Sequence, residues 1–467
     1  MKIHPSDLLL EEALNLPPGE KHPLFGHLAS CPHCQSRLGG LRDHLSRRPY
    51  LNETADAAPG AGILRLSGPT ACRSRECFDY GPAIERSERK YLEHARALHR
   101  ERLEAPGLLA DLLSHPQEKR KLLLANSARF HTWGVFELLL ERSWHTRGAS
   151  RTRSEDLADL VIHLGPYLDA AYYQRELIED MQARAWSYKA NLRRLASDFE
   201  GAEQAFQIAY SHLKSGTREP LERAVYLDLK ASLRGTQRRL DEAKKLLHRA
   251  IAIFLHQGDG HLAGKSMVCL SWIHSHAGEL EHAVATLRRS LLMIDPTQDE
   301  RLLLCAWHNL IDFMTSMGRF IEAQGFYRNA RPLYHKYADD AEYGPRRLWV
   351  KGKIARGLGQ LQEAEELFMS ARKRFLADDI PLDAALVSLE LAILYAQQNR
   401  TAELKQLAPE MLSIFTSRHV SREAIAALMF LKQTVDAERL TVQTAAGIAR
   451  FVDRAARDPN LKFEAPV

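Results

Sequence analysis

The residues with the clearest capacity for chemistry lie near the N-terminus, in the stretch His27-Leu-Ala-Ser-Cys31-Pro-His-Cys34. His27 and Cys31 are four positions apart, so both side chains share one face if this segment is helical. Cys31 and Cys34 are three positions apart, which allows both thiolates to bind one ion from a tight turn. Tetrahedral zinc takes four nitrogen or sulfur ligands at such spacings. The stretch therefore predicts three ligands of a zinc ion.

The fourth zinc ligand has to come from another part of the chain. We expect it to be His4, which opens a first helix that ends near Pro17 and Pro18. The alternatives are His22, His33 and His44. Four protein ligands leave no open position for a substrate, so the predicted Zn²⁺ is structural rather than catalytic. The competing interpretation is an incidental cysteine pair that caps a small helical hairpin.

This N-terminal segment resembles the zinc-binding anti-sigma-factor domain. That family has an upstream His or Cys followed by His-x3-Cys-x2-Cys at the end of a second helix, and His4, His27, Cys31 and Cys34 follow this order. The resemblance covers only about 45 residues. It implies zinc binding and a sigma factor as partner. The chain departs from many members in having no membrane helix, and from the redox-responsive ones in having His4 instead of a cysteine.

The remaining cysteines and motifs indicate no further catalytic chemistry. Cys72 and Cys77 lie in a linker-like stretch rich in Ala, Gly, Pro and Ser, and we expect both to be free thiols. The alternatives are that they bind a second metal ion or form a redox pair. Cys269 and Cys305 lie in apolar helical patterns and are predicted core residues. The sequence contains no G-x-x-x-x-G-K-[ST] and no H-E-x-x-H motif. We therefore expect a protein that is not an enzyme.

The elements that follow repeat at a spacing of 40 or 41 residues. Each unit has a small residue, a large residue four positions later and a small residue three positions further, all on one helix face. The triplets are Ala202/Phe206/Ala209, Ala243/Leu247/Ala250, Ala283/Leu287/Ser290, Ala323/Tyr327/Ala330 and Ala364/Phe368/Ala371. Small residues let neighbouring helices approach closely, and the large residue fills the space between them.

A second helix precedes each triplet helix. Twelve positions before each leading alanine stands another, mostly small, residue: Ala190, Ala231, Ser271, Ile311 and Gly352. A tight turn between the two helices is marked in three units by Gly278, Gly318 and Gly359, which tolerate a positive φ. The pattern predicts an all-α array of stacked helical hairpins.

These small–large–small triplets resemble the tetratricopeptide repeat (TPR) family over about residues 183–420. The period of 40 exceeds the family's usual value of about 34, which implies longer helices. The last unit departs from the pattern, with Leu404, Ala408 and Met411 in place of the triplet. The resemblance implies an α-solenoid whose concave face, lined by the first helices, binds peptides or protein segments.

The chain divides by pattern into five parts. They are the zinc-binding unit 1–51, a linker 52–82, degenerate helical repeats 83–182, the TPR-like repeats 183–420 and capping helices with a tail at 421–467. The highly charged stretch that opens the helical part is expected to end before Pro106. A net charge of +5 in 467 residues, without a concentrated basic face, argues against nucleic acid as a partner. Without a membrane-spanning apolar run, we expect a cytoplasmic protein.

The predicted groove residues come from the first helices of the repeats. They are Arg184, Asn191, Arg194, Asp228, His308, Asp312, Arg346, Lys353 and Arg356. Arg346, Lys353 and Arg356 would favour a ligand segment that is acidic or carries a carboxylate. The alternative interpretation is that the predicted groove residues form an ordinary solvated polar face. We expect a regulatory or scaffolding protein that binds a protein or peptide. The alternative is a sensor of a signalling peptide, or an adaptor, in which the zinc unit is purely structural.

Overall fold

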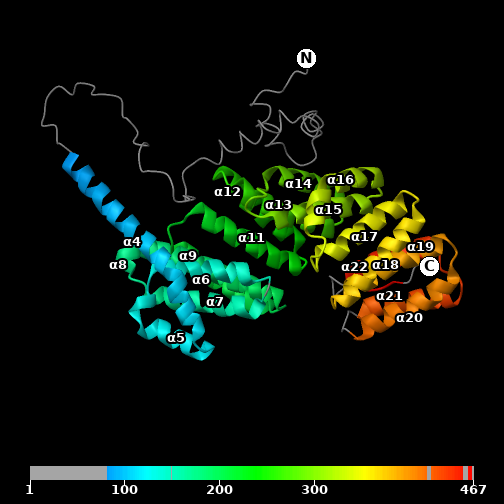
Figure 1. The fold of residues 1–467 in the computed structure, drawn as a ribbon, viewed down its shortest axis with the longest axis horizontal. Coiled ribbons are helices and arrows are strands. Elements are labelled where there is room, and N and C mark those ends of the chain that lie inside the picture. The colour runs from blue at the N-terminus through cyan, green and yellow to red at the C-terminus, as the bar shows by residue number, and fades with distance from the viewer. Residues whose placement is uncertain (1–80, 149, 418–421, 456–460, 465–467) are drawn as a thin grey trace, which may run out of the picture. The chain divides into compact units, whose positions relative to one another are not determined.

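The computed structural model describes residues 81–148, 150–417, 422–455 and 461–464, and these residues contain helices and no strands (Figure 1). The described residues form two compact units, which we call the N-terminal unit (81–237 and 248–258) and the C-terminal unit (238–247 and 259–464). The boundary falls within α12 (Leu240–His256). The predicted all-α fold of consecutively paired helices is confirmed.

Eight α-helices lie wholly within the described part of the N-terminal unit. They are α4 (Gly81–Ser114), α5 (Gln117–Asn126), α6 (Trp133–Thr146), α7 (Arg151–Leu164), α8 (Ala170–Tyr173), α9 (Arg175–Leu195), α10 (Phe199–Ser215) and α11 (Pro220–Thr236). Two short 3-10 turns accompany them, Ala128–Phe130 and Gly165–Tyr167. Their buried aromatic and aliphatic side chains, among them Phe130, Phe136 and Leu164, form one core.

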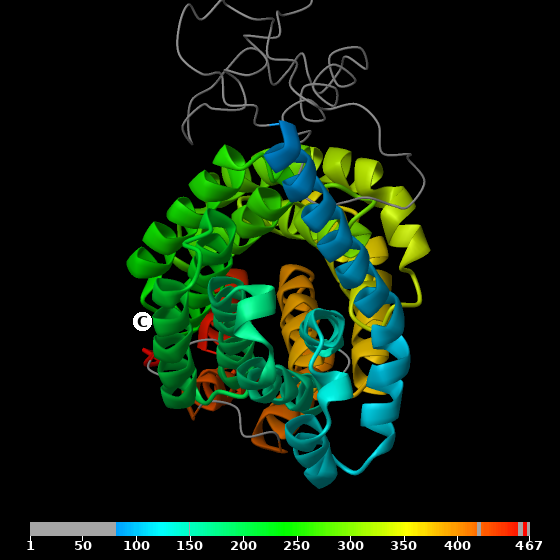
Figure 2. The ribbon, with the colours of Figure 1, turned by 90° about the vertical axis from the view of Figure 1, so that its left-hand side faces the viewer.

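The long helix α4, which runs from blue to cyan in Figure 2, differs from the sequence prediction, because it continues through Pro106. A proline inside a helix removes one backbone hydrogen bond and costs about 3 kcal/mol. On this helix Ala105, Leu109 and Leu112 are buried, and their burial offsets that cost. The expected end before Pro106 is therefore wrong.

The described C-terminal unit contains ten complete α-helices after α12. They are α13 (Gly260–His276), α14 (Leu280–Met293), α15 (Glu300–Ser316), α16 (Phe320–Lys336), α17 (Tyr343–Gly357), α18 (Leu361–Ala377), α19 (Pro381–Gln397), α20 (Thr401–Ser417), α21 (Arg422–Asp436) and α22 (Val442–Ala455). Successive helices pair as hairpins, as α17 and α18 do (Figure 1). Most hairpin helices are 17 residues long, which accounts for the long repeat period.

From the α9–α10 hairpin to the α21–α22 hairpin, the turn between the two helices has a left-handed residue at the same register. Gly278, Gly318 and Gly359 have φ of 79°, 73° and 80°, as predicted. The equivalent residues of other hairpins are not glycines: Ser197, Arg238, Asn399 and Glu438. In the glycine turns the next amide donates to a carbonyl five residues earlier, as Glu279 does to His274, in a Schellman arrangement. The turn at Glu438 places α21 and α22 in the same register as the preceding hairpins.

The predicted triplets form the contacts between helices. Every triplet residue except Tyr327 is buried, and so are the replacements Leu404, Ala408 and Met411 in the last predicted unit. Gly352 shows why a small residue is needed on the first helix. A Cβ atom added there would lie 2.6 Å from a ring carbon of Phe368. Cys269 and Cys305 carry free thiols and are half-buried, so they lie at the edge of this packing rather than in its centre.

Candidate peptide-binding groove

The first helices of four successive hairpins, together with α22, line one groove in the C-terminal unit. Its volume is about 650 Å³, and α13, α15, α17, α19 and α22 all contribute side chains to it. Two tryptophans lie in this groove, Trp272 and Trp349, and Trp272 is 39% exposed. Because its wall crosses several repeats, the groove suits a ligand that is extended rather than compact.

Five of the nine predicted groove residues line this groove. They are His308, Asp312, Arg346, Lys353 and Arg356. Their shared location follows from the repeat register, since equivalent positions of successive first helices lie side by side. Asp312 and Lys353, which are 41 residues apart, have their charged atoms 2.8 Å apart.

Acidic residues of neighbouring helices neutralise the three predicted cations of the groove. Lys353 Nζ lies 2.8 Å from Asp312 Oδ1 and 3.9 Å from Glu390 Oε1. The guanidinium of Arg356 donates to Glu390 Oε2 at 2.8 Å. The sequence pattern did not single out Glu390, whose side chain is only 13% exposed. The groove is therefore less basic than its arginines and lysine alone would make it.

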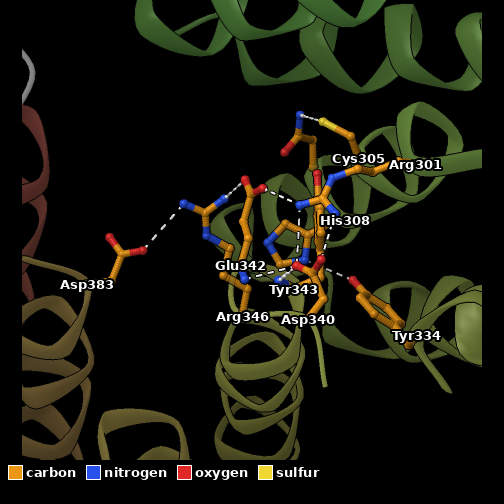
Figure 3. A network of polar contacts seen from close by, with 10 residues as sticks. Arg301, Cys305, His308, Tyr334, Asp340, Glu342, Tyr343, Arg346 and Asp383 are labelled. Carbon is orange, nitrogen blue, oxygen red and sulfur yellow. Dashed lines mark hydrogen bonds and ion pairs between the residues drawn. The ribbon is translucent and has the colours of Figure 1, made fainter. Parts of the chain in front are cut away.

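Arg346 is also held between two carboxylates (Figure 3). One terminal nitrogen donates to Glu342 at 2.7 Å and the other to Asp383 at 3.4 Å. Glu342 belongs to a wider network, because Arg301 also donates to it and to Asp340. This network positions Arg346 at the side of the groove rather than leaving it free to pair with a ligand.

Arg450 is the cation of the groove that has no carboxylate partner among the described residues. It is exposed, and it comes from α22, the second helix of the last hairpin. The repeat pattern did not point to it, because Arg450 lies outside the first-helix positions from which the groove was predicted. It is the residue of this groove with the greatest capacity to bind an additional negative charge.

His308 lies beside Arg346 and has a distinct chemistry (Figure 3). Its Nδ1 is 2.9 Å from the hydroxyl of Tyr334, a residue that is almost completely buried. Burial lowers the pKa of His308 to about 4. The positive charges of Arg346 and Lys353 also lower this pKa, whereas the negative charge of Asp312 raises it. The imidazole is therefore neutral at pH 7 and can accept the hydrogen bond from Tyr334.

The other four predicted groove residues belong to the N-terminal unit and do not line this groove: Arg184, Asn191, Arg194 and Asp228. Arg184 forms an ion pair with Glu222 on α11, where its Nε donates to Oε2 at 2.8 Å. Arg194 donates to the side-chain oxygen of Asn191 at 2.9 Å and to Thr236 at 3.2 Å. Asp228 is 4% exposed. In this unit the predicted residues therefore contact neighbouring helices and one another.

The predicted zinc ligands His4, His27, Cys31 and Cys34 lie outside the described residues, as do Cys72 and Cys77. Zinc binding stays a prediction from the sequence. Within the described ranges, no group of three or more His, Cys, Asp or Glu side chains is arranged to hold a metal ion. In the same ranges, no helix combines the length and apolar character needed to cross a bilayer.

Comparisons with known proteins give a similarity in structure and none in sequence. No family model matches the chain, and no curated protein matches it. Among solved structures, the chain is similar to the crystal structure of a Rap protein complexed with competence and sporulation factor. The match covers 69% of this chain and 91% of that chain, at 12% sequence identity and a TM-score of 0.48.

Proposed function

We propose that this protein is a non-enzymatic regulator or scaffold that binds an extended peptide or protein segment in the groove of its C-terminal unit. Side chains from α13, α15, α17, α19 and α22 line one groove, so a ligand there would contact several repeats at once. Helical repeats use such stacked first helices to present a continuous binding surface. This continuity across repeats is the main support for a binding role.

The charges of the groove favour a ligand with a carboxylate. Arg346, Lys353 and Arg356 are already paired with carboxylates of the protein, whereas Arg450 has no carboxylate partner in the part of the chain that the structure describes. Arginine binds carboxylates through two parallel hydrogen bonds, which makes it the natural anchor for an acidic side chain or a C-terminal carboxylate. Trp272 would contact an apolar side chain of the same segment, since part of its ring system is exposed.

A displayed library of random twelve-residue peptides tests this proposal on the full-length chain. We expect the selected peptides to be enriched in acidic residues. Arg450→Ala should weaken their binding by about tenfold or more, because a hydrogen bond to a charged group contributes about 1.5–3 kcal/mol. Isothermal titration calorimetry with synthetic copies of the selected peptides provides the measurement.

Arg454→Ala is the matched control, because Arg454 is exposed on the same helix and does not line the groove. This variant should bind the selected peptides as the wild type does. The proposal fails if the library yields no binders, or if both variants lose affinity equally.

We further propose, from the spacing of His27, Cys31 and Cys34 alone, that the N-terminal segment binds one structural Zn²⁺ with His4 as the fourth ligand. Metal analysis of the purified full-length protein should find about one zinc per chain. The double variant Cys31→Ser, Cys34→Ser should lose it, because serine is a poor zinc ligand. Wild-type protein purified without chelators and found free of zinc would contradict the proposal.

The zinc variant also separates the two regulatory proposals. If the N-terminal segment engages a sigma factor, as its resemblance to anti-sigma domains implies, the double variant loses that binding and retains peptide binding in the groove. If the protein is instead a sensor of a signalling peptide, or an adaptor with a purely structural zinc unit, no sigma factor binds the wild-type chain. Co-purification with purified candidate sigma factors distinguishes these results.

A further inference from the structure

A second pocket lies on the opposite face of α17 from the groove. Its volume is about 500 Å³, and α16, α17 and α18 line it. Helix α17 directs Arg346 and Lys353 to the groove, and Arg347 and Lys351 to this second pocket. All of its lining residues belong to the C-terminal unit.

The charges in this pocket are poorly balanced, unlike those in the groove. Three arginines and a lysine line it, and Glu363 is the only carboxylate among the lining residues. Glu363 is already bound to Lys351, at 2.7 Å. The three arginines have no carboxylate partner among the described residues: Arg328, Arg331 and Arg347.

The side-chain hydrogen bonds of these arginines go to neutral partners, and Arg347 has one with Tyr327. Arg328 donates to the amide oxygen of Gln324 at 3.2 Å, and Arg331 donates to His335 at 3.3 Å. The Nε of Arg347 is buried and has no hydrogen-bond acceptor. Buried polar groups nearly always have a partner, so Arg347 Nε is available to donate to an additional acceptor.

An aromatic and aliphatic wall lies beside the arginines. Tyr327 forms part of it and is the one triplet residue that is not fully buried. Its ring stacks on Tyr334, with centroids 5.3 Å apart and an interplanar angle of 27°. Leu348 and Leu367 extend the apolar part of the lining. Small-molecule sites have this composition, with apolar walls and a few polar anchors, and the volume lies in their usual range.

We propose that this pocket binds a small organic phosphate of about nucleotide size. The phosphate accepts hydrogen bonds from Arg328, Arg331 and Arg347, whose guanidinium groups suit phosphate geometry. The organic part contacts Tyr327 and Leu367. This site is separate from the peptide groove, and its existence does not depend on the function proposed for that groove.

Calorimetry on the full-length protein with AMP, inorganic phosphate and adenosine as probes tests both parts of the site. We expect AMP to bind with a Kd below about 1 mM, phosphate to bind at least about tenfold more weakly, and adenosine not to bind measurably. Arg347→Gln should weaken AMP binding by about tenfold or more. Arg328→Gln should weaken it in the same direction, and because Arg328 is exposed, this variant is expected to fold normally.

Arg346→Gln is the matched control, since it removes the same charge from the adjacent residue of α17 on the groove side. It should leave AMP binding unchanged, with folding of each variant checked by circular dichroism. The proposal is overturned if AMP does not bind, if adenosine or phosphate binds as tightly as AMP, or if Arg346→Gln weakens AMP binding as much as Arg328→Gln.

Discussion

Replacing Phe368 by Ala is expected to lower the free energy of unfolding of the C-terminal unit by about 3–5 kcal/mol. The Phe368 side chain is fully buried, and its ring lies against Gly352, where an added Cβ atom would be 2.6 Å from a ring carbon. It packs in one core with Phe375 and Leu389. Removing the ring therefore leaves a cavity between helices that cannot collapse without moving whole hairpins. Urea denaturation followed by circular dichroism measures the loss.

Met369→Ala is the control for this prediction, because Met369 is the next residue on α18 and is 54% exposed. Its substitution should change the free energy of unfolding by no more than about 0.5 kcal/mol. Equal effects of the two substitutions would show that the triplet position does not carry the packing between helices.

Lowering the pH from 7 to 4 is expected to destabilise the C-terminal unit through His308. Its pKa is about 4 in the folded protein, where burial favours the neutral imidazole, against 6.5 in the unfolded chain. The unfolded state therefore takes up the proton first. Stability from this group is fully present above pH 6.5 and is lost as the pH falls toward 4, by up to about 3 kcal/mol. Burial also lowers the pKa of His261 and of His274, which act in the same direction.

Urea denaturation at a series of pH values, compared with the variant His308→Asn, isolates the contribution of His308. Asparagine keeps a neutral acceptor for the Tyr334 hydroxyl but does not titrate, so the variant should lose less stability between pH 7 and pH 4. Identical pH profiles for wild type and His308→Asn would contradict the assignment.

The helical packing was predictable because it depends on short-range periodicity. Ala364, Phe368 and Ala371 are four and three positions apart, and such offsets place side chains on one helix face whatever the rest of the chain does. The same holds for the turns at Gly278, Gly318 and Gly359. The left-handed residues Ser197 and Asn399 were not predicted from the sequence, because neither is a glycine, although both have a positive φ. The 40-residue register alone would have located them.

The charge of the groove was not predictable in the same way. Arg356 and Glu390 are 34 residues apart in sequence and are joined only because α17 and α19 lie near each other in the stack. Arg450 reaches the groove from α22, nearly one hundred residues beyond Arg356. No local sequence pattern indicates which cation forms an ion pair with which carboxylate, or which cation has no carboxylate partner in the described part of the chain.

By itself, the sequence determined that this chain forms an array of helical hairpins, because packing between neighbouring helices depends on residue size at fixed local offsets. It also predicted the face from which the C-terminal groove residues would come. Only the tertiary structure decided the electrostatics of the two faces of α17. Arg346, on one face, is paired with carboxylates, whereas Arg347, on the other, has no carboxylate partner within the described ranges, because Coulombic pairing depends on distances between groups from different helices.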